Sequence, residues 1–200
     1  MRSFLIIVVF ILTGCGDPSV SKESHFEKDL PDTSASWSGK RTGETFVLTR
    51  QLEKKLKLDS LQDGILGSEI RIWNFRSSVD PQSLTILKSI TTQNWQLHKL
   101  AFNFANPDSL ISEAIFTFEV TQADSLQLVN LWHLKSQSDL KNGDQYGCLD
   151  GNTIFVELSN LNRYRFSWYN CPFINRDRDS IFLEITKLMH LIDKFSDRSK

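Results

Sequence analysis

Residues 148–172 read CLDGNTIFVELSNLNRYRFSWYNCP, and this stretch decides the fold class. It contains three short runs that are separated by turn-forming residues, and we expect each run to be a β-strand. The expected strands are 146–149, 153–158 and 163–169. Asp150-Gly151 between two such runs is a strong hairpin signal, and a second loop follows around Asn160. The stretch therefore predicts a three-stranded antiparallel meander.

The register of the second hairpin depends on the length of its loop. A two-residue turn at 160–161 would place Val156 opposite Arg165 and bring charge into the apolar face. A loop one residue longer places Val156 opposite Phe166, which makes that face wholly apolar. Glu157 then lies opposite Arg165 on the exposed face. We predict this second register, because a single buried face should contain no unpaired charge.

Strict alternation of apolar and polar residues predicts further strands along the chain. These strands are 68–75, 95–104 and 114–120. Residues 45–49 are also rich in β-formers, whereas 50–58 could extend that strand or form a short helix, and the pattern leaves both readings open.

Three helices are expected from helical periodicity and capping signals. Asp80-Pro81 offers an N-cap followed by proline at the first helical position, which predicts a helix over 80–91. Asp124-Ser125 predicts a second helix that ends near 138. Residues 180–195 carry apolar side chains at helical spacing and form an amphipathic C-terminal helix. The fold class is therefore α+β, a mainly antiparallel sheet with about three helices.

The N-terminal residues have the pattern of an export signal. Arg2 precedes an unbroken apolar run at 4–12 (FLIIVVFIL), which ends at small residues. As a helix this run would rise about 14 Å at roughly 1.5 Å per residue, whereas the hydrocarbon core of a bilayer is about 30 Å thick. It is too short to span a membrane.

Leu12-Thr13-Gly14-Cys15 resembles the lipobox of bacterial lipoproteins. The resemblance implies that residues 1–14 are removed and that Cys15 carries the lipid that anchors the chain to a membrane of the cell envelope, facing the periplasm or the surface. Residues 15–42 are then expected to form a flexible tether, because they are rich in Ser, Asp, Lys and Pro. Residues 43–200 would form one globular α+β domain.

A disulfide between Cys148 and Cys171 is expected. Once Cys15 carries lipid, these are the two remaining cysteines, and an even pair in an oxidising compartment is most simply a disulfide. A metal site would need closer cysteine spacing and a nearby histidine. Two strand spacings, about 9.6 Å, exceed the reach of a disulfide, so both cysteines must lie beyond the end of the middle strand.

The same stretch also resembles a hairpin of uncharacterised secreted and lipid-anchored bacterial proteins. The residues that carry the resemblance are Cys148-Leu149-Asp150-Gly151, Glu157, Tyr164 and Cys171-Pro172. No activity is assigned to that hairpin, so the resemblance supports the envelope location and implies no chemistry.

Composition and motifs favour a binding or scaffolding function over catalysis. The formal net charge of −1 argues against nucleic acid as a partner. The chain contains no HExxH, GxSxG or GxxxxGK[ST] motif, and we assign no catalytic residue, metal ligand or cofactor. The expected partners are the membrane, through the lipid, and an envelope protein or small ligand. The alternative is a small envelope hydrolase, which requires His98, His133 or His190 to converge with an acid and a serine or metal.

The five tryptophans are candidates for an exposed contact surface, although most of them should be core residues. They are Trp37, Trp73, Trp95, Trp132 and Trp168.

Four Asp-Ser-aliphatic triplets resemble an acceptor motif for O-glycosylation of exported bacterial proteins. They begin at Asp59, Asp108, Asp124 and Asp179. The same dipeptide is also favoured at the start of a helix, and the sequence leaves both readings open.

Overall fold

The structure is a computed structural model and describes residues 26–30, 37–76, 81–107, 109–140, 143–146, 148 and 151–198. The expected signal, the lipobox with Cys15 and most of the expected tether lie outside these residues. Asp150 of the expected hairpin turn also lies outside them.

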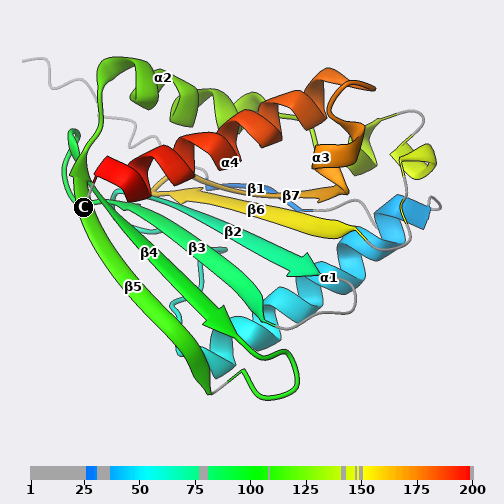
Figure 1. The fold of residues 1–200 in the computed structure, drawn as a ribbon, viewed down its shortest axis with the longest axis horizontal. Helices are drawn as coiled ribbons and strands as arrows, with labels where there is room; N and C mark the ends of the chain where they lie inside the picture. Colours follow the sequence, from blue (N-terminus) through cyan, green and yellow to red (C-terminus); the bar gives the residue numbers. More distant parts are fainter. Residues whose placement is uncertain are drawn as a thin grey trace, which may run out of the picture.

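A seven-stranded sheet forms the centre of the fold, in the order β1-β7-β6-β2-β3-β4-β5 (Figure 1). All neighbours are antiparallel except the short strand β1, which pairs in parallel with β7. The strands are β1 (Glu27–Asp29), β2 (Ser68–Arg76), β3 (Gln82–Ser89), β4 (Asn94–Phe102), β5 (Leu110–Glu119), β6 (Asn152–Asn160) and β7 (Arg163–Asn170). The expected α+β class with a mainly antiparallel sheet is confirmed.

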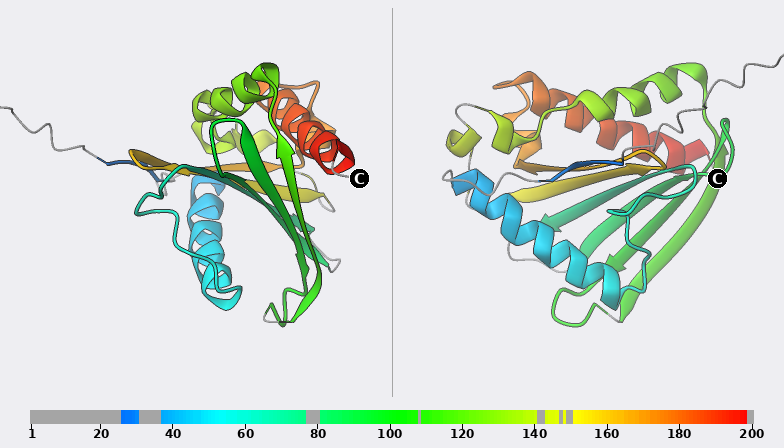
Figure 2. Two further views of the ribbon diagram at one scale, coloured as in Figure 1. Left: turned by 90° about the vertical axis from the view of Figure 1, so that its left-hand side faces the viewer. Right: turned by 180° about the vertical axis from the view of Figure 1, so that it is seen from behind.

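Helices cover both faces of this sheet, as the edge-on view in Figure 2 shows. Helix α1 (Trp37–Lys55) packs on one face, and α2 (Gln122–Asn130) and α4 (Ser180–Arg198) pack on the other. Each face therefore has its own apolar core. On the α4 face the core includes Ile72, Val156, Ile185, Leu188 and Phe195, and on the α1 face it includes Leu52, Trp73, Phe155, Phe166 and Trp168.

The helix expected over 80–91 was wrong, because Gln82–Ser89 is strand β3. Leu84 and Leu87 have helical spacing, but here they point to opposite faces and enter different cores. A strand that is buried on both faces reads as a nearly continuous apolar run, which periodicity cannot distinguish from a helix.

The N-terminal part of the domain also differs from expectation. The β-rich segment 45–49 lies inside α1, so the strand predicted there was wrong, and the helical reading of the following residues holds up to Lys55. The expected domain start at residue 43 falls within the same helix. Glu27–Asp29, which was assigned to the tether, pairs with β7.

The remaining helices agree better with the expectations from the sequence. Helix α4 confirms the amphipathic C-terminal helix. Helix α2 begins with Thr121 as its N-cap, and Asp124 is the third helical residue of a reciprocal capping box. After α2 the chain continues in 3₁₀ turns, η1 (Leu131–His133), η2 (Gln137–Asp139) and η3 (Gly143–Gln145), instead of one helix to 138. Among the described residues, none of the helices is both long and apolar enough to cross a membrane.

The register of the β6–β7 hairpin was predicted wrongly. Val156 lies opposite Ser167, and Glu157 lies opposite Phe166, because the turn contains Leu161 and Asn162. The prediction assumed one buried face, whereas both faces of this hairpin are covered. With both sides buried, there is no exposed face for the charge of Glu157, which pairs with Arg50 of α1, so the criterion could not choose between registers.

The expected third strand of the meander is also absent from its described residues. Tyr146 and Cys148 are not in a strand, and the second neighbour of β6 is β2. The long-range β2–β6 pairing leaves no local signal in the sequence, so the hairpin reading could not find it.

The disulfide between Cys148 and Cys171 is present, with Cα atoms 6.3 Å apart. Cys171 follows the end of β7, and Cys148 precedes β6, so both cysteines lie beyond the end of that strand, as the spacing argument required. Gly151 packs directly on the disulfide. A Cβ atom at residue 151 would overlap both sulfur atoms.

Candidate functional site

A cleft of about 890 Å³ lies on the α4 face of the sheet. Near one end of strands β2–β5, the residues facing α4 are large and apolar and belong to the core: Ile70, Leu87, Leu97 and Phe116. Four residues further along each strand, the same face carries small or polar residues: Asn74, Ser83, Ala101 and Ser112. This change leaves the space between sheet and helix unfilled and lined with hydrogen-bonding groups.

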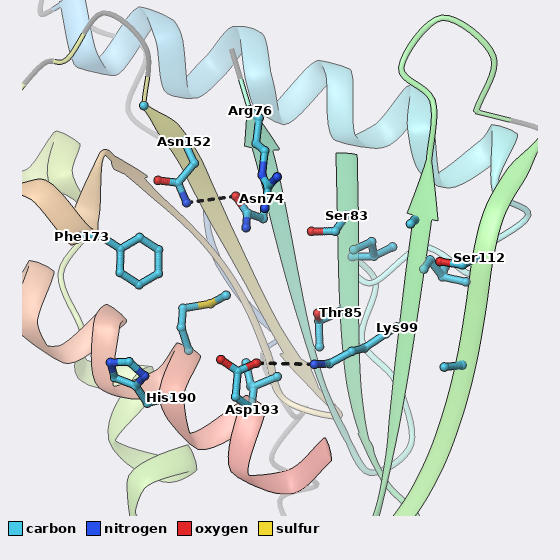
Figure 3. A pocket seen from close by; sticks show the side chains of 17 residues that line it. Asn74, Arg76, Ser83, Thr85, Lys99, Ser112, Asn152, Phe173, His190 and Asp193 are labelled. Carbon is cyan, nitrogen blue, oxygen red and sulfur yellow. Dashed lines mark hydrogen bonds and ion pairs between the residues drawn. The ribbon is translucent and has the colours of Figure 1, made fainter. Parts of the chain in front are cut away.

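The opposite wall of the cleft comes from α4 and from α3 (Pro172–Asn175), a single helical turn. Figure 3 shows Phe173, His190 and Asp193 on this side, facing the polar side chains of the strands. Asp193 lies 3.6 Å from Nζ of Lys99 and connects the two walls.

Several polar groups of the cleft have no protein partner among the described residues. The guanidinium group of Arg76 and the imidazole of His190 form no hydrogen bond or ion pair with another side chain in the part of the chain that the structure describes. Asn152 Nδ2 donates to Asn74 Oδ1 at 3.1 Å, which uses one hydrogen-bonding group of each amide. Because an unused polar group in a concave site normally binds water or ligand, the cleft is equipped to hold a polar molecule.

The disulfide fixes the position of Phe173. Cys171 adopts a left-handed conformation with φ of 51°, and Pro172 occupies the first position of α3. The buried Asn175 closes the turn, because its Nδ2 donates to the carbonyl of Asn170 at 3.2 Å. The Phe173 ring is therefore presented to the cleft by a rigid turn, although it is 40% exposed.

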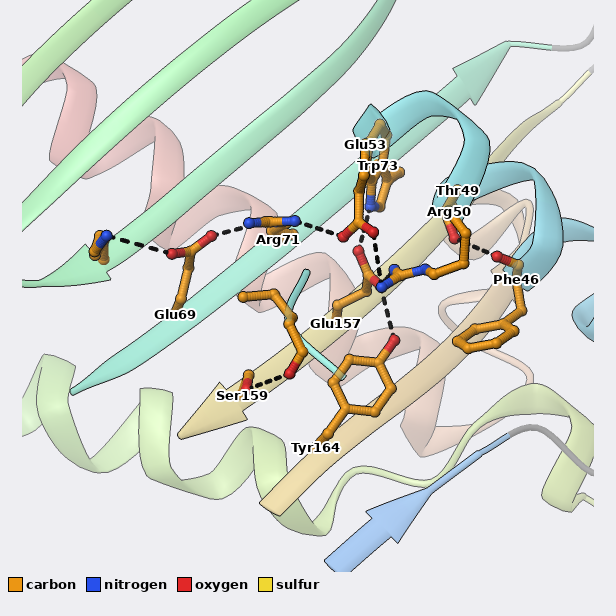
Figure 4. A network of polar contacts seen from close by, with 12 residues as sticks. Phe46, Thr49, Arg50, Glu53, Glu69, Arg71, Trp73, Glu157, Ser159 and Tyr164 are labelled. Carbon is orange, nitrogen blue, oxygen red and sulfur yellow. Dashed lines mark hydrogen bonds and ion pairs between the residues drawn. The ribbon is translucent and has the colours of Figure 1, made fainter. Parts of the chain in front are cut away.

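A second polar cluster, which we call the buried ion network, lies between α1 and the sheet (Figure 4). Its charged residues come from three elements: Arg50 and Glu53 on α1, Glu69 and Arg71 on β2, and Glu157 on β6. All are buried except Arg50, whose side chain is 13% exposed.

Glu157 is the centre of this network and has no contact with its expected partner Arg165. Its carboxylate pairs with Arg50 and accepts hydrogen bonds from Trp73 Nε1 at 2.7 Å and from the Tyr164 hydroxyl at 2.8 Å. Arg165 instead pairs with Asp29 at 3.2 Å. The expected exposed pair of Glu157 and Arg165 was therefore wrong.

Burial dominates the electrostatics of the network. It raises the pKa of Glu53, although Arg50 and Arg71 act in the opposite direction. Burial also lowers the pKa of Arg50 and raises that of the Tyr164 hydroxyl. Since the charges pair with one another, we assign the network a structural role, the attachment of α1 to the sheet.

The three histidines that a hydrolase would need do not converge. His98 pairs with Glu113 at 2.7 Å on strands β4 and β5, on the face that α1 covers. His133 lies in η1, and His190 lies in the cleft on the other face. No group of three or more His, Cys, Asp or Glu residues that could hold a metal occurs among the described residues.

The tryptophans are mostly core residues, as expected. Trp73, Trp95 and Trp168 are buried, and the side chain of Trp37 lies outside the described part. Trp132 is half-buried and stacks with the guanidinium group of Arg163, 4.0 Å from its ring centroid. The tryptophans therefore do not mark a common binding surface.

Arg76 and Phe173 were missed by sequence reasoning. The signal that could have indicated the cleft is the change from aliphatic to small polar residues on alternate positions of β2 and β3. Recognising it requires the strand registers, because the four strands contribute to one face only when they are aligned.

Comparison of the chain with known protein families, with curated proteins and with solved structures found no match.

Proposed function

We propose that this protein is an exported, lipid-anchored envelope protein whose domain binds a small polar ligand in the cleft between α4 and strands β2–β5. The observation that carries the binding function is the set of polar side chains that line the cleft and have no partner among the described residues, above all Arg76. The lipobox resemblance at Cys15 and the disulfide support the envelope location.

A substitution that fills the cleft should abolish ligand binding and leave the fold unchanged. Ser112 is exposed on β5 and lines the cleft, so Ser112→Leu adds volume there without entering a core. We expect amide resonances of Gly151, Ser112 and Phe173 to shift in ¹H–¹⁵N NMR spectra of the full chain on titration with galactobiose, digalacturonate or alanyl-alanine, and these shifts to disappear in Ser112→Leu.

Thr117→Leu is the matched control, because Thr117 is exposed on the same strand and does not line the cleft. It should bind like the wild type. The proposal fails when none of the three probes shifts the cleft resonances, or when Ser112→Leu binds as the wild type does.

A further inference from the structure

The cleft carries excess positive charge on a protein whose net charge is negative. Its lining contains two cations, Arg76 and Lys99, and one carboxylate, Asp193, while the whole chain has a formal charge of −1. Lys99 and Asp193 pair with each other at 3.6 Å, so among the residues that the structure describes no carboxylate compensates the charge of Arg76. A planar guanidinium group binds a carboxylate or phosphate with two parallel hydrogen bonds.

Phe173 gives the cleft that contains this cation an apolar platform. Its side chain is 40% exposed, and within the described part of the chain its ring packs against no other aromatic ring. The polarised face of an aromatic ring attracts C–H groups, and the C–H face of a sugar ring has the size and flatness to stack on it.

The strand side of the cleft offers both donors and acceptors in fixed positions. Ser83 and Ser112 provide hydroxyl groups, and Asn74 and Asn152 keep amide groups that their mutual hydrogen bond does not use. Groups that both donate and accept match the hydroxyls of a polyol, which also do both. The volume of about 890 Å³ is within the range of small-molecule sites and has room for two sugar rings.

We infer that the cleft binds an acidic saccharide, with Arg76 holding a carboxylate or phosphate group of the sugar and Phe173 stacking on a ring. This inference rests on the proposed function, because it names the ligand class of the same cleft. The hydroxyl groups of the sugar bind to Ser83, Ser112, Asn74 and Asn152.

Digalacturonate and galactobiose test the inference directly, because they share ring and hydroxyl pattern and differ in the carboxylates. We expect calorimetry with the full chain to give at least about tenfold tighter binding of digalacturonate, the effect of one charge-assisted contact. Arg76→Gln should abolish this preference and keep weak binding of galactobiose. Arg178→Gln is the matched control, since Arg178 is exposed and outside the cleft.

The stacking role of Phe173 predicts a different pattern. Phe173→Ala should weaken the binding of both sugars by about tenfold and leave the ratio of their dissociation constants unchanged. Ile174→Ala is the control, because Ile174 is the exposed neighbour in α3 and does not line the cleft. Galactose 6-phosphate, titrated in parallel, identifies the oxyanion: tighter binding than digalacturonate selects phosphate, and weaker binding selects carboxylate.

Equal binding of digalacturonate and galactobiose overturns the inference while the proposed function stands. Displacement of digalacturonate by acetate or inorganic phosphate at equal concentration also overturns it, because the cleft would then bind an anion without recognising a sugar. If neither the sugars nor alanyl-alanine shifts the amide resonances of the cleft residues, the proposed function itself is contradicted.

Discussion

Gly151 shows how a turn signal in the sequence can have another cause. Asp-Gly suggested a hairpin turn, for which glycine would need a positive φ, but Gly64 and Gly67 are the glycines with positive φ among the described residues. Glycine is required at 151 because the disulfide occupies the space of a side chain. Its small size lets the disulfide hold α3, and with it Phe173, against the end of β6.

Gly151→Ala should therefore destabilise the oxidised protein. The added methyl group overlaps the sulfur atoms of Cys148 and Cys171, and overpacking of this kind costs about 1–3 kcal/mol. Urea denaturation of the wild type and the variant measures the loss. The control is the same substitution in a Cys148→Ser, Cys171→Ser background, where the cost should be smaller. An equal cost in both backgrounds would show that the disulfide is not the reason for glycine.

Helix α1 is attached to the sheet by charges as well as by apolar contacts, which makes its attachment depend on pH. Burial raises the pKa of Glu53 above its ordinary value of 4.5, so the folded protein favours the protonated carboxyl group. A raised folded-state pKa contributes stability that is present below the ordinary pKa and is lost as the pH rises through the raised one.

We expect the free energy of unfolding of the wild type, relative to Glu53→Gln, to fall as the pH rises above 4.5, since glutamine cannot titrate. Urea denaturation at several pH values gives this difference. Glu44→Gln, on the exposed side of α1, controls for the loss of one carboxylate from the helix. The same pH trend for both variants would mean that burial of Glu53 is not its cause.

The elements that the sequence predicts well are those with strong local signals. Helix α4 was found from its apolar stripe, and β4 was found from local alternation, although its two faces contribute to different cores. Strand β3 was missed because Leu84 and Leu87, which enter different cores, have helical spacing, and the β6–β7 register was missed because both faces of that hairpin are covered. The disulfide could be expected from the cysteine count together with the export signal, whereas pairings of distant segments bring Arg76 and Phe173 to one cleft.

At the scale of the whole molecule, the two faces of the sheet are packed differently. On the α1 face, apolar residues and the buried ion network fill the space under the helix, and a smaller cleft of about 510 Å³ lies beyond its C-terminal end, beside β4 and β5. The α4 face is closed near one end of strands β2–β5 and open near the other, where small polar residues replace the aliphatic ones. A cleft whose strand wall is backed by a packed core suits a binding domain, since side chains held by a rigid sheet lose little conformational entropy when a ligand binds.

The proposed anchor predicts a lipid on Cys15 of the chain expressed in bacteria. The full-length wild type should incorporate an alkyne-labelled fatty acid and sediment with membranes, whereas Cys15→Ala should do neither. Cys148 and Cys171 provide an internal control, because cysteines that react with an alkylating reagent only after reduction show that the chain reached an oxidising compartment. An unlabelled wild type with both thiols free would contradict the anchor and the envelope location together. An unlabelled wild type with the disulfide formed would contradict the lipid alone and leave export standing.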